Sequence, residues 1–456
     1  MEIKMKIVIV GDGKVGFTLS QQLAKEGHDI VIIDNNETVL NNSSNTLDVN
    51  CIKGNGANYK IQEKAGVQEA DLMIAVTSRD ELNIICCLIA KKLGAKHTIA
   101  RVRNPEYSDE MSFIKDELGL SMAVNPEAAA AAEIARILQF PSAIKIDSFS
   151  RGKVELAEFK VMPNSPLGGM AIHTLYSKYK IRILICAVQR KGAVFIPNGD
   201  FRLQEGDKVT ITASPKNMTD FFRQIGILMH KIKTVMIVGG GKIAYYLCNQ
   251  ICNLGMKVKI IEIDPEQCSQ LTDLLPKAMI INADGSDQEV LNEEGIEGVD
   301  AFVALTNMDE ENVIISMYAI SRGVDKVITK INHLTFMEIM ENAGIDCIIS
   351  PKYITANHII RYVRAMQNSW GSNVETMTKI VDNQVEALEF RVRESFRGLN
   401  VPLKDIELKK NLLVACITRK GQIIIPSGQD TIQLGDSVIV VTTINGLREL
   451  NDIFRM

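Results

Sequence analysis

The sequence lacks a segment able to cross a membrane. A transmembrane helix needs about 18 or more consecutive apolar residues, and no such run occurs among the 456 residues. The nearest run, Ile84–Ala90, is followed at once by Lys91 and Lys92. The first residues lead directly into an expected strand without a small-residue cleavage site, so we also expect no secretory signal. These absences predict a chain with no membrane span of its own.

An excess of one charge is also lacking. The chain has 51 Lys and Arg against 55 Asp and Glu, a formal net charge of −4. Because nucleic acid is bound by clustered basic surface, this balance argues against nucleic acid as the main ligand. The composition, 46% apolar and 23% charged, is that of a soluble globular protein. Its length predicts about three domains.

Cysteine motifs are lacking as well, although the chain has nine cysteines. None forms a CxxC pair, and no Cys and His residues have the spacing of a zinc site. Most stand in apolar runs such as Ile84–Leu88, where a reduced thiol behaves as a small hydrophobe. Cys248 and Cys252 are four positions apart on an expected helix, whose geometry disfavours a disulfide. We therefore expect reduced, buried thiols in a cytosolic protein and no metal site.

The second half of the chain repeats the first. Ile9–Gly16 recurs as Ile237–Ala244, and Thr77–Asn83 recurs as Thr306–Asn312 at nearly the same offset along the chain. Two shorter matches follow at this offset, namely Arg190–Gly192 with Arg419–Gly421 and Gln204–Asp207 with Gln433–Asp436. Four matches at nearly one offset indicate a tandem duplication with copies of about 228 residues.

In each copy, apolar runs typical of buried strands alternate with helical patterns. The expected strands of the first copy are Lys6–Val10, Ile30–Ile33, Leu72–Thr77 and Thr98–Val102. The helices between them include Gly16–Glu26 and Leu82–Leu93. This alternation predicts βαβ crossovers and a parallel sheet covered on both faces. A helix at about Pro126–Gln139 closes the unit, and one near Tyr353–Gln367 closes its copy.

After each closing helix, strands separated by Gly, Asn and Asp turns predict a smaller lobe. In the first copy they are Val154–Val161, Ile181–Gln189, Ala193–Ile196 and Lys208–Thr212. The predicted fold class is α/β, with two tandem repeats, each a Rossmann-like doubly wound parallel sheet followed by a small α+β lobe. The expected domains are residues 1–140, 141–230, 231–370 and 371–456.

A glycine-rich turn joins the first expected strand to the first helix. In Gly11-x-Gly13-x-x-Gly16 the glycines suit a tight turn, a close pyrophosphate and close packing of helix on strand. Asp34 ends the next apolar strand, where a carboxylate accepts both ribose hydroxyls and repels a 2′-phosphate. The pattern predicts NAD(H) or an adenine nucleotide rather than NADP(H), and the alternative is a turn that binds nothing. The expected contacts are Gly11, Asp12, Gly13, Lys14, Val15 and Asp34.

The second copy keeps this pattern with two changes. Ala244 stands at the third glycine position, which the fingerprint tolerates. Glu262 takes the place of Asp34 and is an equally suitable ribose acceptor. A second nucleotide site is therefore expected, although a duplicated site can keep its fold and lose its ligand. The expected contacts are Gly239, Gly240, Gly241, Lys242, Ile243 and Glu262.

Other matched positions suit the same pockets. They are Asn55 and Gly56 with Asp284 and Gly285, Thr77 with Thr306, and Arg101 with Lys330. The first group follows the third strand and can contact an adenine edge. The threonines end the fourth strand, and the two cations end the fifth, where such sheets bind ligands. The alternatives are strand-end capping for the threonines and a surface ion pair for Arg101.

The groups that an enzyme needs are lacking. None of the six histidines recurs at the matching position of the other half, and no Ser-His-Asp arrangement, metal motif or P-loop is present. The segment that follows each Rossmann unit is too short for a typical substrate domain. We therefore expect binding without turnover and no enzyme, with a small-substrate NAD-dependent oxidoreductase as the alternative function.

The glycine turns, Asp34 or Glu262, the Thr77–Asn83 segment and the duplication together resemble the TrkA family. Its members are the peripheral regulatory subunits of Trk-type potassium uptake systems and contain tandem RCK (KTN) domains. The resemblance implies Rossmann lobes that bind NAD(H), and in some members ATP or ADP. It also implies a homotetrameric ring on the cytoplasmic face of a membrane potassium-translocating subunit, whose pore it gates. The helices at 126–139 and 353–367 resemble the crossover helices that join neighbouring lobes.

Overall fold

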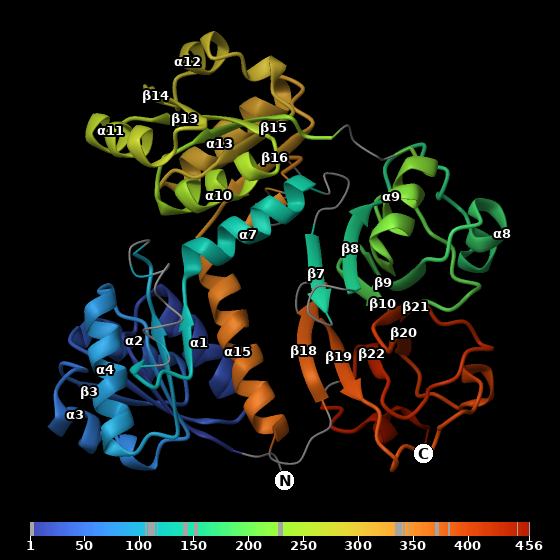
Figure 1. The fold of residues 1–456 in the computed structure, drawn as a ribbon, viewed down its shortest axis with the longest axis horizontal. Helices are drawn as coiled ribbons and strands as arrows, with labels where there is room; N and C mark the ends of the chain where they lie inside the picture. The colour runs from blue at the N-terminus through green and yellow to red at the C-terminus, as the bar shows by residue number, and fades with distance from the viewer. Residues whose placement is uncertain are drawn as a thin grey trace.

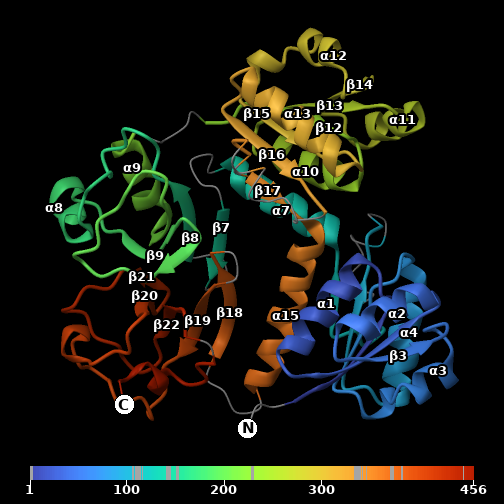
Figure 2. The same ribbon diagram turned by 180° about the vertical axis from the view of Figure 1, so that it is seen from behind.

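The computed structural model contains four lobes, two built on parallel sheets and two on antiparallel sheets (Figures 1 and 2). It describes residues 4–104, 107, 115, 117–139, 145–149, 154–226, 231–332, 340, 343–345, 347–369, 374–381, 384–444 and 446–455. The expected domain boundaries at 140/141 and 370/371, and residue 230, lie outside these ranges. No helix of the described part is long and apolar enough to span a membrane.

The first Rossmann lobe has six parallel strands in the order β3-β2-β1-β4-β5-β6. Its strands are β1 (Lys6–Val10), β2 (Asp29–Asp34), β3 (Asn50–Lys53), β4 (Leu72–Ala75), β5 (His97–Arg101) and β6 (Met122–Val124). Its helices are α1 (Lys14–Lys25), α2 (Glu37–Thr46), α3 (Tyr59–Lys64), η1 (Val67–Glu69) and α4 (Asp80–Leu93). The central strands are almost wholly apolar and buried because helices cover both faces of the sheet.

The second Rossmann lobe repeats this topology in the order β14-β13-β12-β15-β16-β17. Its strands are β12 (Thr234–Val238), β13 (Lys257–Glu262), β14 (Ala278–Asn282), β15 (Ala301–Ala304), β16 (Lys326–Lys330) and β17 (Cys347–Ile349). Its helices are α10 (Lys242–Asn253), α11 (Pro265–Leu274), α12 (Gln288–Glu293), η4 (Ile296–Gly298) and α13 (Asp309–Ser321). In both lobes the strand order reverses beside the first strand, where such sheets bind ligands.

The two small lobes each contain a five-stranded antiparallel sheet. The first consists of β7 (Lys145–Phe149), β8 (Val154–Lys160), η3 (Ile172–Thr174), α8 (Leu175–Tyr179), β9 (Leu184–Arg190), β10 (Ala193–Phe195), β11 (Lys208–Ala213) and α9 (Pro215–Gln224). The second consists of β18 (Val374–Ile380), β19 (Val385–Arg391), η6 (Leu403–Asp405), β20 (Leu412–Arg419), β21 (Gln422–Ile424), β22 (Ser437–Thr442) and η7 (Leu450–Ile453). One apolar cluster, including Leu156, Cys186, Ala387 and Cys416, joins the two sheets.

The repeated Arg and Asp residues of the small lobes form matching ion pairs. Arg190 binds Asp207 through two hydrogen bonds of 2.7 and 2.8 Å, and Arg419 binds Asp436 at the same positions of the second copy. Both carboxylates also accept a backbone N–H from the preceding turn. The Asp207 side chain is fully buried, and the positive charge of Arg190 compensates its negative charge. These repeated residues therefore stabilise the fold rather than form a site.

One helix of each repeat packs in the Rossmann lobe of the other repeat. Helix α7 (Pro126–Gln139) follows the first Rossmann sheet but packs against α10, in the core of the second lobe. Helix α15 (Pro351–Ser369) follows the second sheet but packs against α1, in the core of the first lobe. Figures 1 and 2 both show this reciprocal exchange, which ties the lobes together. It confirms the crossover role that the resemblance implied for these helices.

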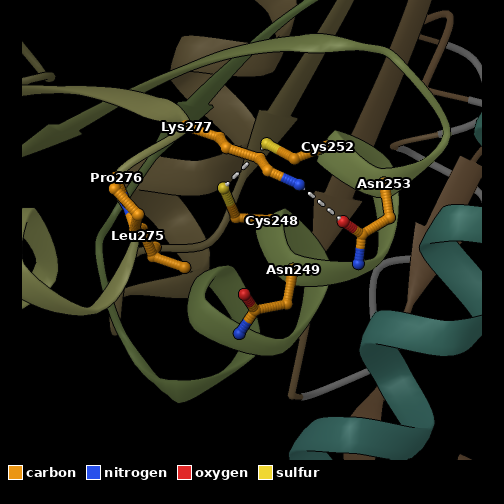
Figure 3. Close-up of a pocket in the computed structure, with 7 residues that line it drawn as sticks. All are labelled: Cys248, Asn249, Cys252, Asn253, Leu275, Pro276 and Lys277. Atoms are coloured by element: carbon orange, nitrogen blue, oxygen red, sulfur yellow. Dashed lines mark hydrogen bonds between the residues drawn. The ribbon is translucent and has the colours of Figure 1, made fainter.

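The cysteines are largely buried, as the sequence predicts. All nine are free, and only Cys51 and Cys252 are partly exposed. Cys248 and Cys252 lie side by side on α10, with their sulfur atoms 3.4 Å apart (Figure 3).

The predicted fold class is confirmed, and most of the expected elements are present. β1 and α7 have the expected ends, and α15 extends two positions further at each end than expected. β3 (Asn50–Lys53) is the third strand expected before Asn55, whose bounds the sequence did not fix, whereas β6, β7 and β18 were not anticipated from the sequence. β9 begins at Leu184 rather than at Ile181, since residues 181–183 are at least partly exposed and make no strand pairing.

Candidate functional site

The first Rossmann lobe has a cavity of about 690 Å³ at the carboxyl edge of β1, β2 and β4. Most of the residues expected at the first site line it, from the glycine turn to the ends of β4 and β5. These are Gly11, Gly13, Lys14, Val15, Asp34, Asn55, Gly56, Thr77 and Arg101. The cavity is also lined by residues that the sequence did not single out, Asn35, Asn36, Val39, Gly54, Ser78, Arg79 and Leu82 among them.

Each of the three turn glycines suits its position for a different geometric reason. Gly11 has a φ of +96°, a conformation that side chains disfavour. Gly13 has open space where a Cβ would stand, so a ligand can approach the backbone there. A Cβ on Gly16 would lie 1.9 Å from the carbonyl oxygen of Gly11, so only glycine lets the helix pack this close to the turn. The expected tight turn at Gly11 and close packing at Gly16 are therefore present, and the space at Gly13 leaves room for the expected ligand.

Asp34 ends β2 with its carboxylate at the cavity. One carboxylate oxygen accepts the N–H of Asp12 at 2.7 Å, and the other accepts the N–H of Asn36 at 2.8 Å. These bonds fix the orientation of the carboxylate. A carboxylate offers about four lone-pair sites, so two remain for ligand hydroxyl groups.

Asp12 differs from its neighbours in the turn, because its side chain is only 2% exposed. The hydroxyl of Ser43 donates to one carboxylate oxygen at 2.5 Å, and the other oxygen has no hydrogen-bond partner. Burial raises the pKa of Asp12 to about 6, with a smaller contribution from Asp34, while Ser43 opposes the shift. The structure thus places the Asp12 carboxyl beneath the turn and not among the residues that line the cavity.

The substitution Asp12→Asn is expected to stabilise the protein above pH 6. The folded-state pKa is raised, so the stability linked to this proton is present below about pH 4 and is lost as the pH rises through 6. Removing the charge should raise the free energy of unfolding by about 1–3 kcal/mol at pH 8 and by little at pH 4. Thermal unfolding at both pH values measures the difference. Asp48→Asn, at an exposed position, is the matched control, and equal gains at both pH values would contradict the prediction.

The first two glycines and the strand-end carboxylate of the second Rossmann lobe are placed as in the first lobe, although Ala244 stands where the first turn has Gly16. Gly239 has a φ of +98°, and the position of Gly241 is open to solvent. One carboxylate oxygen of Glu262 accepts the N–H of Gly240 at 2.6 Å, and the other accepts the N–H of Asp264 at 2.9 Å. The longer glutamate therefore repeats both bonds of Asp34. Lys242 is exposed and Ile243 is buried, as are their counterparts Lys14 and Val15.

The loops after the third strand are also equivalent in the two lobes. The side chains of Asn55 and Asp284 each accept a backbone N–H two positions further on, which fixes a turn. A Cβ on Gly56 or Gly285 would lie 2.2 or 2.4 Å from a methyl group of the first strand, Val10 or Val238. These glycines therefore let the loop lie directly against the first strand.

The repeated Thr-x-x-Asp-Glu-x-Asn segment connects the ends of the fourth and fifth strands. The Asn83 side chain accepts the N–H of Thr77 at 2.8 Å and donates to the carbonyl of Arg101 at 2.9 Å. Asn312 makes the equivalent bonds to Thr306 and Lys330. Both asparagines are fully buried. This bracing role was missed from the sequence, although the recurrence of the asparagine was its signal.

Asp80 and Asp309 begin α4 and α13 and also bind the segment that follows the fifth strand. Asp80 accepts the N–H groups of Arg103 and Asn104, both at 2.8 Å, and Asp309 accepts the N–H of Asn332. Each carboxylate therefore holds the chain that leaves the fifth strand. Their negative charge at a helix N-terminus also interacts favourably with the helix macrodipole.

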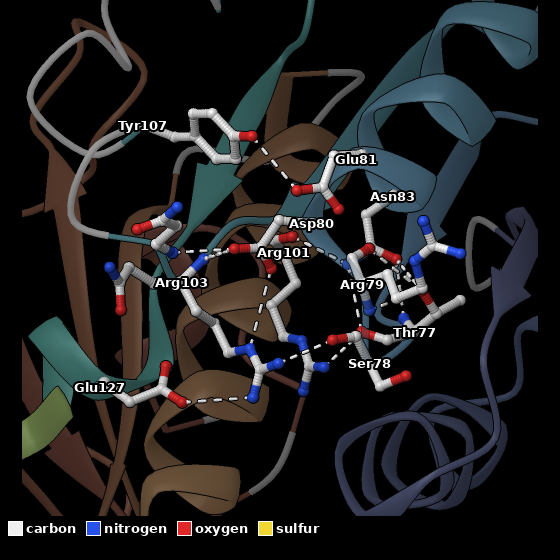
Figure 4. A network of polar contacts seen from close by, with 12 residues as sticks. Thr77, Ser78, Arg79, Asp80, Glu81, Asn83, Arg101, Arg103, Tyr107 and Glu127 are labelled. Carbon is white, nitrogen blue, oxygen red and sulfur yellow. Dashed lines mark hydrogen bonds and ion pairs between the residues drawn. The ribbon is translucent and has the colours of Figure 1, made fainter. Parts of the chain in front are cut away.

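Two arginines lie at the cavity wall of the first lobe, and Arg103 joins this wall to the crossover helix (Figure 4). Arg101 donates to the carbonyl of Thr77, and Arg103 donates to the carbonyl of Ser78 at 2.7 Å. Arg103 also lies 3.7 Å from Glu127, at the start of α7. Burial lowers the pKa of Arg101, and its Nε is buried without a hydrogen-bond partner. Arg101 is thus part of a buried network rather than of a surface ion pair.

A second connection lies between the lobes. Tyr246 of α10 donates to the carbonyl of Arg103 at 3.2 Å and accepts from the Asn125 side chain at 2.9 Å. Lys330 is 8% exposed, and its ammonium group lies 3.4 Å from the carbonyl of Leu305. Burial lowers the pKa of Lys330, Asp309 opposes this, and the charge of Lys14 in the other lobe adds to it. The two glycine turns therefore belong to lobes whose charges interact.

The contacts made across the lobe boundary could not be found from the sequence. Arg103, Glu127 and Tyr246 carry no motif, and they meet only because α7 crosses to the second lobe. Lys352 of α15 likewise interacts with a residue of the other repeat, since its pKa is lowered by burial and by Lys14.

Comparison with known proteins gives a consistent family assignment. A TrkA-N domain model matches residues 7–126 and 235–351, and a TrkA-C domain model matches residues 156–226 and 387–455. The chain is 33% identical to "Trk system potassium uptake protein TrkA homolog 1" of Methanosarcina mazei, over 99% of this chain and 100% of the relative. It is 35% identical to "Trk system potassium uptake protein TrkA homolog" of Archaeoglobus fulgidus, with the same coverage.

A solved structure described as "GsuK channel bound to NAD" shares the fold, with a TM-score of 0.63 and 16% identity over 97% of this chain and 77% of that one. The relatives carry the names of potassium transport proteins and not of enzymes, in line with the sequence-based prediction. The chain therefore belongs to the TrkA family of Trk-system potassium uptake proteins, with two TrkA-N and two TrkA-C domains in tandem.

Proposed function

We propose that this chain is a regulatory subunit that binds NAD(H), or ATP and ADP, and gates a membrane potassium-translocating subunit of the Trk type. The observation that carries the proposal is the strand-end carboxylate held by the glycine turn in both lobes. Asp34 and Glu262 keep free lone pairs for ribose hydroxyls, and they would repel the 2′-phosphate of NADP(H). The NAD-bound structure of the same fold is consistent with this choice of ligand.

The residues around the first cavity fit a dinucleotide. Gly13 leaves the backbone open beside the N-terminus of α1, where unpaired N–H groups attract a pyrophosphate. Lys14 and Arg101 add positive charge, and the free Nε of Arg101 offers a further donor. The loop of Asn55 and Gly56 would contact the adenine. We extend the same assignment to Gly239, Gly241, Lys242, Asp284, Gly285, Thr306 and Lys330 of the second lobe.

The connections between the lobes suggest how binding would reach the pore. Lys14 repels Lys330 of the other lobe and Lys352 at the start of α15, and an anionic ligand beside Lys14 would reduce this repulsion. Movement of the Thr77–Arg79 loop would also pass through Arg103 and Glu127 to α7. A ligand shifts such an equilibrium only by its differential affinity for the two states, about 1–3 kcal/mol per coupled site. Several sites in one assembly would therefore act together.

We further propose that the chain forms a homotetrameric ring with eight Rossmann lobes on the cytoplasmic face of the membrane. Ile85 on α4 and Ile314 on α13 occupy matching positions and are 46% and 65% exposed. Met308 and Met317 extend the second of these apolar surfaces. Exposed apolar surface of this kind is typical of an assembly interface. Light scattering of the purified protein should give four chain masses, and a monomer would contradict the ring.

The substitution Asp34→Ala tests the nucleotide role. It removes the ribose acceptor and the bonds that hold the turn, so NAD(H) affinity at the first site should fall about 10- to 150-fold, since bonds to charged groups contribute about 1.5–3 kcal/mol. Isothermal titration calorimetry of Asp34→Ala, of Glu262→Ala and of the double variant separates the two sites. Glu37→Ala, which removes an exposed acid paired with Lys53, is the control. Unchanged affinity in the double variant would refute the assignment.

Gating requires a second measurement. The chain and its membrane partner should be reconstituted in vesicles, and potassium flux should change on addition of nucleotide with the wild type but not with the double variant. If the chain bound nucleotide but potassium flux did not respond to it, the gating proposal would be wrong and the binding proposal would stand. Turnover of NAD(H) with small alcohols or acids would instead support the alternative of an oxidoreductase.

A further inference from the structure

The two neighbouring thiols of α10 border a cavity outside the nucleotide site. Cys248 and Cys252 have their sulfur atoms 3.4 Å apart, and Cys252 is partly exposed whereas Cys248 is 1% exposed. The cavity has a volume of about 130 Å³ (Figure 3). Its wall is completed by Asn249 and Asn253 of the same helix and by Leu275, Pro276 and Lys277 of the loop between α11 and β14. The position differs from the glycine turn, which lies at the other end of α10.

A direct disulfide does not fit this pair. Residues four apart on a helix have Cβ atoms about 5–6 Å apart, whereas a disulfide needs a Cβ separation of about 3.5–4.5 Å. Closing the bond would therefore distort α10, whose core side packs against the second sheet and α7. The two sulfur atoms already face one another, so a bridge with one additional atom between them avoids this distortion.

A structural zinc ion does not fit either. Zinc in proteins takes four ligands, usually Cys and His, and within the described residues no three His, Cys, Asp or Glu side chains come together as a metal site. The other polar groups at this cavity are the Asn249 and Asn253 amides and the ammonium group of Lys277, which bonds Asn253 at 3.0 Å. The site therefore offers two ligands, both sulfur.

We propose that Cys248 and Cys252 form a dithiol site that captures a trivalent arsenical by bridging both sulfur atoms to one arsenic atom. With an organoarsenic oxide, two As–S bonds form as the As–O bonds break. The two thiol protons and the oxygen leave as water, so no oxidant or reductant is required. The apolar wall of Leu275 and Pro276 would accommodate the organic group. The site is independent of the nucleotide assignment.

The other cysteines do not offer an equivalent pair. Cys51 is partly exposed, but its thiol lies against the carbonyl of Leu40 and not beside another sulfur. Cys86 and Cys87 are adjacent in the chain and are fully buried. Cys186 and Cys416 are also fully buried. Burial also raises the pKa of the Cys248 thiol. Reagents that attack single thiolates should therefore react slowly at Cys248, whereas a reagent that binds both thiols at once gains from the pairing.

The test uses the full-length, folded chain and phenylarsine oxide as the probe. Intact-mass spectrometry after removal of free reagent should show one phenylarsine adduct per chain, which a small dithiol removes and a monothiol at equal concentration does not. Cys252→Ser and Cys248→Ser should each abolish the dithiol-specific adduct. Cys51→Ser, which removes the other partly exposed thiol, should keep it.

Peptide mapping should locate the adduct between residues 248 and 252, and the thermal unfolding of each variant should confirm that it is folded. Absence of the adduct in the wild type, or its persistence in folded Cys252→Ser, would overturn the proposal. So would ready formation of a 248–252 disulfide with diamide, because that would show that the helix accepts a direct bond.

Discussion

Gly16→Ala is expected to destabilise the first Rossmann lobe by about 3 kcal/mol, because overpacking a tight contact costs about 1–3 kcal/mol and occasionally more. The new methyl group would stand 1.9 Å from the carbonyl oxygen of Gly11, and that oxygen belongs to backbone that cannot rotate away. Either α1 moves off the sheet or the turn changes shape. Both outcomes displace the N–H groups of residues 12–14, so nucleotide binding at the first site should also be lost.

The second copy provides the matched control, since Ala244 occupies the equivalent position and is fully buried there. Ala244→Gly should cost only about 0.5–1 kcal/mol, the usual difference between Gly and Ala in a helix. Chemical denaturation measures the stability, and calorimetry measures the remaining nucleotide sites. If the two substitutions reduced the stability equally, the clash with the Gly11 carbonyl would be relieved at no cost. That result would also remove the explanation given for glycine at position 16.

The turn and its carboxylate were predictable because they depend on residues close in sequence. Gly11 and Gly13 lie within one turn, and Asp34 is positioned by the single βαβ step between β1 and β2. The duplication then provided an internal check, since Glu262 recurs where Asp34 stands and makes the same two bonds. Local backbone geometry and topology are the features that sequence patterns describe best.

The position of the Asp12 side chain was not predictable in the same way. Its backbone lies in the turn, and on that basis the residue was expected among the ligand contacts. The direction of the side chain depends on Ser43, which lies on α2, distant in the chain, and provides its hydrogen bond. The second copy has Gly240 at this position, so the repeat gave no indication that a buried carboxyl was required.

The partners of α7 and α15 were also beyond the sequence. Each helix shows an apolar face, which predicts burial but does not identify the sheet that covers it. Either helix could have packed on its own lobe. The exchange depends on the relative placement of two lobes that are widely separated along the chain, and it alone brings Arg103, Glu127 and Tyr246 together. Only the resemblance to a family with crossover helices suggested it.

Val363→Asp is expected to disrupt the first Rossmann lobe although residue 363 belongs to the second repeat. Val363 is fully buried in the same cluster as Leu19, Ile7 and other residues of α1 and β1. A carboxylate there has no partner in this apolar cluster, and burying an unpaired charge or losing this packing costs about 4 kcal/mol or more. Hydrogen exchange should therefore rise in β1 and α1, and nucleotide binding at the first site should be lost.

The reciprocal substitution, Ile134→Asp in α7, should have the same effect on the second lobe, because Ile134 is buried against residues of α10 and β12. Asn357→Asp, which adds the same charge at a partly exposed position of α15, should leave both lobes unchanged. If each substitution instead affected the lobe of its own repeat, the helices would pack in the unexchanged arrangement in solution. The crossed pattern of damage is specific to the exchange, since general destabilisation of the chain would raise hydrogen exchange in both lobes alike.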